Sequence, residues 1–244
     1  MQDLVEKGIP KEKMMAFPLG LNVKRLSPKI SGIYIREKLK LNNPPTIIYV
    51  GTMEKVRGLD FLLRVLVRVK KKIQDIKLLM VGDGSDRTQL EKLSQSLGIK
   101  ESVTFTGQVP RSQVPEYIAA ADVGVSPIPP LPMYQVSSPT KLIEYMGMGR
   151  AAIGNNIPDQ KEVINNSGGG ICVRYDEGEF ARAIIELLNN PKKAKEMGEK
   201  GREWVVRNRS YEILANNLEQ RYFDLVQSNL LKNHGTKNTE VIDE

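Results

Sequence analysis

Short apolar runs alternate with longer amphipathic segments along most of the chain, and this alternation limits the fold more than any other feature. The runs are typical of strands buried on both faces of a parallel sheet. They predict strands over 46–50, 77–81, 103–106, 122–126, 151–154 and 170–173. Apolar residues spaced three or four apart predict helices over 59–71, 87–97, 112–120 and 139–148. Successive βαβ units follow, so we expect an α/β fold with a doubly wound, Rossmann-like parallel sheet.

Both ends of the chain depart from this alternation. Three helices follow the last strand without a strand between them, over 179–188, 192–207 and 211–228. At the other end, a short helix over 1–7, a strand over 14–17 and a connector over 20–45 are expected. The predicted domains are a leading segment and linker (1–22), the Rossmann-like domain (23–210), a last helix (211–228) and a disordered tail (229–244).

The presence of one cysteine and one histidine excludes several functional classes. Cys172 is the only cysteine and His234 the only histidine. This rules out an intramolecular disulfide, a Cys/His zinc site, and a Ser-His-Asp or Cys-His mechanism built from this chain alone. No apolar run approaches the roughly 20 residues that cross a bilayer, and residues 1–7 lack the pattern of a signal peptide. We therefore expect a soluble, cytoplasmic protein.

The charge is moderately basic, with 36 Lys and Arg against 29 Asp and Glu, a net charge of +7. The densest basic run, Lys70–Lys72, ends a predicted helix, where cations oppose the helix dipole. This favours a helix end over nucleic-acid binding, so no nucleic-acid partner is expected. A net positive charge is also compatible with an enzyme that acts near anionic lipids. We therefore expect peripheral contact with the inner face of the membrane.

The turns that leave each strand are the places to search, because ligands of an open parallel sheet bind beyond the carboxyl ends of its strands. The first turn begins with Gly51 and Thr52 and continues to Arg57 and Gly58. Its backbone N–H groups can face an anion while Arg57 grips a phosphate. An ordinary βα turn also needs glycine for its dihedral angles, so both interpretations stay open.

The next two turns are less informative. The turn over 81–85 has the glycine spacing of a phosphate-approaching loop, but it lacks the third glycine of a dinucleotide fingerprint and the Lys-Ser/Thr pair of a P-loop. The turn over 106–110 contains Gly107, Gln108 and Val109, whose backbone could meet a planar base. A plain loop is the alternative there.

The turn after the fourth strand is the most specific. Ser138 is a good N-cap and Pro139 suits the first helical position, which would leave the amides of Thr140 and Lys141 free for a phosphate. Glu144 is predicted in the second turn, among apolar neighbours. Its carboxylate can accept two hydrogen bonds from a ribose diol, or it can be a solvated or lysine-paired helix charge.

Together and in this order, these turns resemble the C-terminal, donor-binding domain of the retaining family 4 glycosyltransferases, group 1 type, which have the GT-B fold. The resemblance runs from about residue 10 to residue 226. The segments that carry it are Phe17–Asn22, Tyr49–Gly58, Val81–Gly84, Val103–Val123 and Ser138–Met146. It implies that the chain is one half of a GT-B architecture, followed by C-terminal helices.

The resemblance implies a site for a nucleotide-diphosphate sugar. Arg57 would contact the donor diphosphate and Glu144 the ribose hydroxyls, while Lys141 would belong to a Ser-Pro-x-Lys variant of the site. These three are the catalytic candidates. The other expected binding residues are Gly51, Thr52, Gly107, Gln108, Val109, Ser138, Thr140 and Leu142. Fixed cations and helix-end amides stabilise a leaving diphosphate, so neither a metal nor another cofactor is expected.

Two residues and one whole domain depart from the family pattern. Thr52 stands where many members carry an arginine, and Val136 stands at the position of the first acid of a glutamate pair. Members also carry an N-terminal Rossmann-like domain that binds the acceptor, and the helix over 211–228 resembles the one that packs onto it. We therefore expect a chain that needs such a domain, in cis or as a separate subunit, and transfers no sugar alone.

Two other functions remain to be weighed against transfer in polysaccharide or glycolipid assembly. Thr52 and Val136 are compatible with a non-catalytic nucleotide-binding or scaffolding module of the same fold. A nicotinamide-dependent dehydrogenase is disfavoured, since its glycine fingerprint and acidic partner are incomplete. The proline-rich run over 127–132 predicts a stiff segment that either shapes the cleft wall or only connects two elements.

Overall fold

A single parallel sheet forms the centre of the protein. The computed structural model describes residues 2–41 and 43–235, with side chains from 4 to 41 and from 43 to 228. The strands are β1 (Thr46–Val50), β2 (Lys77–Val81), β3 (Val103–Phe105), β4 (Val123–Ser126), β5 (Ala151–Asn155) and β6 (Gly170–Val173). Their order is β3-β2-β1-β4-β5-β6, so the order reverses between β1 and β4. This arrangement confirms the predicted doubly wound, Rossmann-like sheet.

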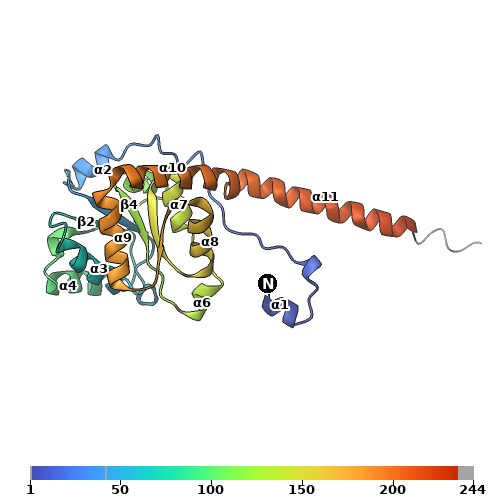
Figure 1. Ribbon diagram of the computed structural model, residues 1–244, viewed down its shortest axis with the longest axis horizontal. Helices are drawn as coiled ribbons and strands as arrows, with labels where there is room; N and C mark the ends of the chain where they lie inside the picture. Colours follow the sequence, from blue (N-terminus) through green and yellow to red (C-terminus); the bar gives the residue numbers. More distant parts are fainter. Residues whose placement is uncertain (1, 42, 236–244) are drawn as a thin grey trace, which may run out of the picture.

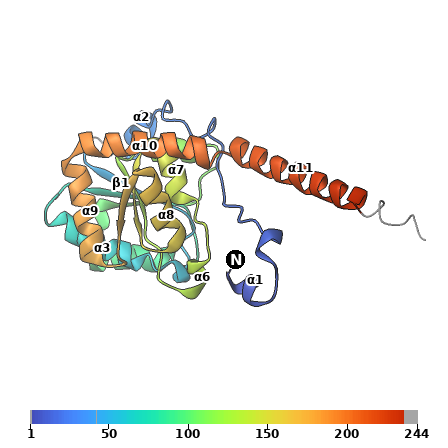
Figure 2. The ribbon, with the colours of Figure 1, turned by 45° about the vertical axis from the view of Figure 1, so that its right-hand side comes forward.

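Helices cover both faces of the sheet (Figures 1 and 2). One core contains residues of α3 (Asp60–Lys70), α4 (Arg87–Ser96) and α9 (Glu177–Asn189). The other core contains residues of α2 (Ile33–Lys38), α5 (Val114–Ala119), α7 (Lys141–Gly147), α8 (Pro158–Ser167) and α10 (Pro191–Asn208). Ile47 faces the first core and its neighbour Ile48 the second, because successive side chains of a strand point to opposite faces.

The ends of the described chain lead away from this body. The N-terminal segment carries α1 (Gln2–Glu6) and η1 (Lys11–Lys13), and α11 (Tyr211–Gly235) projects from the end of α10 (Figure 1). Where the two segments leave, the amide of Leu21 donates to the carbonyl of Arg209 at 2.8 Å, and the amide of Tyr211 donates to the carbonyl of Leu21 at 3.0 Å. The two exits are therefore bonded to each other. Within the described residues, no helix combines the length and the apolar character that crossing a membrane requires.

Most predicted bounds agree with the structure to within two residues, but several elements differ. Residues 14–17 form no strand, because no neighbouring strand pairs with them. The connector over 20–45 contains α2, and α8 was not predicted at all. The last helix continues past Ser228 to Gly235, into the predicted tail, whose remaining residues 236–244 lie outside the described part.

Candidate functional site

Three strand-exit turns meet at the carboxyl edge of the sheet. The amide of Gly51 donates to the carbonyl of Val81 at 2.9 Å, and that of Gly82 donates to the carbonyl of Gly107 at 3.1 Å. A cavity of about 600 Å³ lies at this edge. Its lining residues are Val50, Gly51, Thr52, Val81, Gly82, Asp83, Gln108, Val109, Arg111 and Val114. The structure thus brings Gly51, Thr52, Gln108 and Val109 to one cavity, as expected for the carboxyl end of a parallel sheet.

Two cations lie close to this cavity, each over a buried tyrosine. The Lys141 side chain reaches Gly51, where an added Cβ would lie 2.7 Å from its Cε and 3.1 Å from its Nζ. That Nζ is 5.4 Å from the ring centroid of Tyr49. The Arg57 guanidinium, on the 3₁₀ turn η2 (Lys55–Arg57), is 5.7 Å from the ring centroid of Tyr134. Both contacts are in the range of cation–π attraction, which holds the cations beside the turn.

Burial and the charge of Arg57 both disfavour the ammonium form of Lys141. Burial of the Lys141 ammonium, with the positive charge of Arg57 nearby, lowers the pKa of Lys141 from 10.5 to about 8, and Glu144 only partly offsets this. Burial also raises the pKa of Tyr49, so the phenol stays neutral at physiological pH. An anion bound beside Lys141 and Arg57 would therefore stabilise the ammonium form of Lys141.

Glu144 lies in the first turn of α7, one turn earlier than predicted. Burial raises the pKa of its carboxyl group, and Lys141, Arg25 and Arg111 act in the opposite direction. Arg111 lines the cavity. Arg25 comes from the entry segment, more than 100 residues away in the chain, and sequence reasoning missed it because no local pattern connects it to this site.

The start of α7 differs from the prediction. The helix begins at Lys141, with Thr140 as its N-cap, and Ser138 makes no capping bond. The Ser138 hydroxyl instead lies 3.5 Å from Nη1 of the buried Arg209. Leu142 is buried in the core, so only its backbone could serve a ligand. The expected capping at Ser138 was wrong, because tertiary contacts outweighed the local signal.

A buried polar network holds the segment that follows β4. Asn155 accepts from the amide of Ile128 at 2.8 Å and donates to the carbonyl of Ile128 at 2.9 Å. Gln160 donates to the carbonyl of Ser126 at 3.2 Å. These bonds satisfy polar groups that would be costly to bury alone. The proline-rich segment is thereby fixed, and it leads into α6 (Pro132–Gln135), which places Tyr134 under Arg57.

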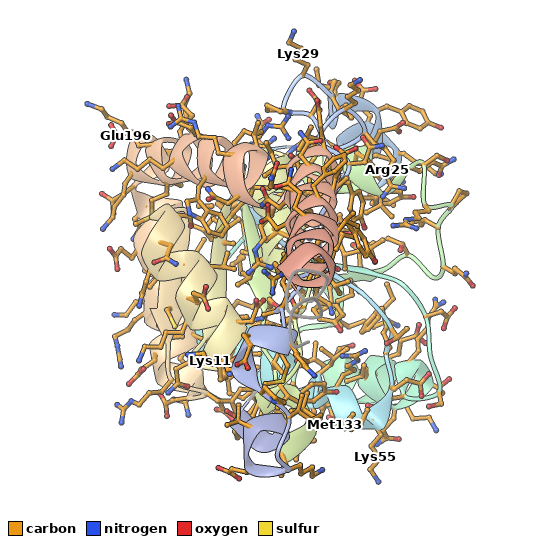
Figure 3. All side chains as sticks on the ribbon, turned by 90° about the vertical axis from the view of Figure 1, so that its right-hand side faces the viewer. Lys11, Arg25, Lys29, Lys55, Met133 and Glu196 are labelled. Atoms are coloured by element: carbon orange, nitrogen blue, oxygen red, sulfur yellow. The ribbon has the colours of Figure 1, made fainter. Side chains whose placement is uncertain are left out.

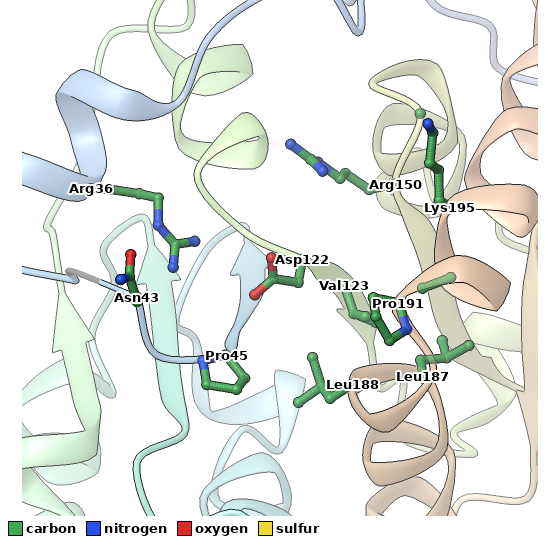
Figure 4. A pocket seen from close by; sticks show the side chains of 12 residues that line it. Arg36, Asn43, Pro45, Asp122, Val123, Arg150, Leu187, Leu188, Pro191 and Lys195 are labelled. Carbon is green, nitrogen blue, oxygen red and sulfur yellow. The ribbon is translucent and has the colours of Figure 1, made fainter.

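The edge with the exit turns lies on one side of the molecule. Figure 3 shows Lys55, from the Arg57 turn, and Met133, from α6, at the bottom of the view, with Lys29 at the top. A second cavity, of about 380 Å³, lies near the amino ends of β1 and β4, where Arg36 and Asp122 face each other (Figure 4). None of the predicted site residues lines it. Among the described residues there is no group of three His, Cys, Asp or Glu side chains suited to a metal, and metal independence stays a prediction.

Comparisons with known proteins identify the family of the chain and agree with its fold. Residues 33–204 match the family model described as "Glycosyl transferases group 1". The chain is 27% identical over 210 residues to a GDP-mannose-dependent alpha-(1-6)-phosphatidylinositol monomannoside mannosyltransferase of Mycobacterium tuberculosis, covering 84% of this chain and 54% of that protein. The chain thus spans about half the length of this curated relative.

Solved structures have the same fold. Anabaena HepE, crystallised in complex with UDP-glucose, matches with a TM-score of 0.78 at 15% identity, covering 91% of this chain and 61% of that one. The C-terminal domain of a group 1 glycosyl transferase family protein from Francisella tularensis matches with a TM-score of 0.66 at 17% identity. That match covers 79% of this chain and all of the Francisella domain (100%).

Proposed function

Because the chain belongs to the group 1 glycosyltransferases, we propose that it is the donor-binding half of a retaining, family 4 enzyme of the GT-B type. It binds a nucleotide-diphosphate sugar for metal-independent transfer in polysaccharide or glycolipid assembly. Two comparisons support the assignment to one half of such an enzyme. The chain covers 54% of the mycobacterial relative, and it matches an isolated C-terminal domain over that domain's whole length.

The observation that carries the proposal is the Lys141 ammonium beside Gly51, with Arg57 close by. Thr52 leaves the turn without the arginine that many relatives carry there, and Lys141 brings a cation to the same turn from α7. Departure of a sugar from its donor develops negative charge on the diphosphate. Two fixed, half-buried cations stabilise that charge, and they do so more strongly than in water.

The nucleotide is proposed to occupy the cavity beside the turn. Gln108 and Val109 line the part expected to receive the base, and Glu144 is assigned to the ribose hydroxyls. Complexes of the Anabaena neighbour with UDP-glucose support a nucleotide sugar as the ligand class.

The second domain is proposed to pack on α11. This helix exposes the large apolar side chains of Tyr222, Phe223 and Val226, at 62%, 57% and 57% of their full area. A patch of this kind marks an interaction site in a soluble protein. We assign it to an N-terminal, acceptor-binding domain, supplied in cis or by another subunit, and we expect no transfer by the described domain alone.

The nucleotide site is tested by ligand-observed NMR of the chain with UDP, GDP, ADP, their sugar conjugates and NAD. We expect one nucleoside diphosphate to bind selectively and to lose about tenfold in affinity in Arg57→Ala and in Glu144→Ala, because each substitution removes a hydrogen bond to or from a charged group. Arg182→Ala, an exposed arginine on α9, is the matched control. Absence of binding across the panel by folded protein would reject the proposal.

Binding should weaken at alkaline pH. The free protein loses the Lys141 proton near pH 8, while a bound diphosphate favours the charged form, so the dissociation constant should rise about tenfold between pH 7 and 9.5. The neighbours that face Lys141 are Arg57, Glu144 and Tyr49, and Tyr49 stays neutral in this range. Calorimetric titrations measure this dependence. Lys141→Arg keeps its charge and should flatten the profile; an equal slope in both proteins would contradict the assignment.

A non-catalytic nucleotide-binding or scaffolding module is the second candidate. It is favoured by Val136, which is 84% exposed and stands at the position of the first acid of the family's glutamate-pair motif. A transfer assay with the reconstituted two-domain enzyme distinguishes the two candidate functions. Loss of transfer in Arg57→Ala and Glu144→Ala supports catalysis, and unchanged transfer supports the module.

A further inference from the structure

The two central strands separate just before the candidate site, and one hydroxyl group bridges the gap. β1 pairs with β4 only through Ile47 with Val123 and Ile48 with Gly124. Beyond these pairs, the amide of Val50 donates to the hydroxyl of Tyr145 at 3.0 Å. The same hydroxyl donates to the carbonyl of Val125 at 3.4 Å. Tyr145 thus takes the place of the missing ladder bonds where the strand order reverses.

The opposite strand is shaped to admit the ring of Tyr145. An added Cβ on Gly124 would lie 2.2 Å from Cδ2 and 2.3 Å from Cγ of that ring. The Tyr145 side chain is fully buried. A larger residue at Gly124 would displace the ring, so the hydroxyl reaches both strands only because Gly124 has no side chain.

Tyr145 and Lys141 are four residues apart on α7, and they contact successive residues at the end of β1 and in the turn that follows it. Residues at this spacing lie on the same face of a helix. Tyr145 binds Val50, and Lys141 lies against Gly51. We infer that Tyr145 is a positioning residue, whose hydroxyl fixes this face of α7 against the end of β1 and so holds the Lys141 ammonium beside Gly51. Its effect on donor binding rests on the proposed function, whereas its effect on Lys141 does not.

Tyr145→Phe tests this inference, because it keeps the ring and removes only the hydroxyl. Without the bond, the end of β1 and α7 should separate enough for water to reach the ammonium. The pKa of Lys141, followed by NMR at its Cε, should then rise from about 8 towards 10.5. Arg57, Glu144 and Tyr49 face the same ammonium and are unchanged in the variant. The exchange rate of the Val50 amide should rise at least tenfold, and the dissociation constant of the nucleoside diphosphate should rise several-fold.

Tyr117→Phe is the matched control, since Tyr117 is a buried tyrosine of the same core on α5. It should leave the pKa of Lys141 and the Val50 exchange rate unchanged. Equal values in Tyr145→Phe and the wild type would overturn the inference. If both readouts shift but wild-type protein binds no nucleotide, the proposed function fails and the positioning role stands.

A measurement on the wild type covers the case in which Tyr145→Phe does not fold. The Val50 amide lies beyond the last β1–β4 pair, yet its bond to a buried hydroxyl should make it exchange as slowly as the amide of Ile48. Exchange as fast as that of an exposed turn amide would overturn the inference.

Discussion

Lys141→Met is expected to weaken binding of the nucleoside diphosphate by about 10- to 100-fold at pH 7 and to leave the fold intact. A hydrogen bond to a charged group contributes about 1.5–3 kcal/mol, and each 1.4 kcal/mol is about tenfold in affinity. Methionine fills a similar volume without a charge. Because burial disfavours the ammonium in the free protein, the free energy of unfolding should not fall. Calorimetric titration and urea denaturation measure the two quantities.

Lys55→Met is the matched control for charge alone. Lys55 is exposed on the same turn as Arg57, so the substitution changes the net charge equally but removes no contact with Gly51. Its affinity should stay within about twofold of the wild type, since exposed charges act weakly through solvent. If both variants lose the same affinity, the ligand is attracted by the net charge of the protein, and the contact with Lys141 is not specific.

Gly82→Ala is expected to destabilise the protein by about 2–5 kcal/mol. Gly82 has a φ of +135°, and an added Cβ would lie 2.1 Å from the carbonyl oxygen of Gly51. The backbone conformation costs about 1–2 kcal/mol for a residue with a side chain, and crowding in a packed place costs about 1–3 kcal/mol more. The obstacle is backbone, which cannot rotate away. Urea denaturation gives the change in the free energy of unfolding.

Gly98→Ala separates the two costs. Gly98 also has a positive φ, of +68°, but an added Cβ would meet nothing within 4 Å. It should therefore destabilise by only about 1–2 kcal/mol. Equal losses in the two variants would show that the contact between the exit turns after β1 and β2 contributes nothing beyond the dihedral angles.

The sheet could be predicted because each strand has its own apolar run, whereas α8 and the segment over 14–17 depend on contacts that lie far away in the sequence. The buried face of α8 includes the polar residues Gln160 and Ser167, so its apolar pattern is weak. The apolar run over 14–17 resembles a strand, yet a strand forms only beside another strand. Pattern alone therefore misses a helix whose buried face is partly polar, and it predicts a strand where no partner strand lies beside the run.

The site divides in the same way. Gly51, Thr52, Gln108 and Val109 could be located because the carboxyl ends of parallel strands share one edge. The hydroxyl of Tyr145, in contrast, binds an amide 95 residues away, and nothing in its local sequence distinguishes it from a core tyrosine. Arg25 likewise reaches Glu144 only through the fold.

The bonded exits at Leu21 and Arg209 restrict how a neighbouring domain can move. Since the incoming segment and the outgoing helix are hydrogen-bonded to each other, they leave the body at a common point. A domain held by both segments would turn about that point, so its approach to the cavity at the carboxyl edge of the sheet would be a rotation rather than a translation.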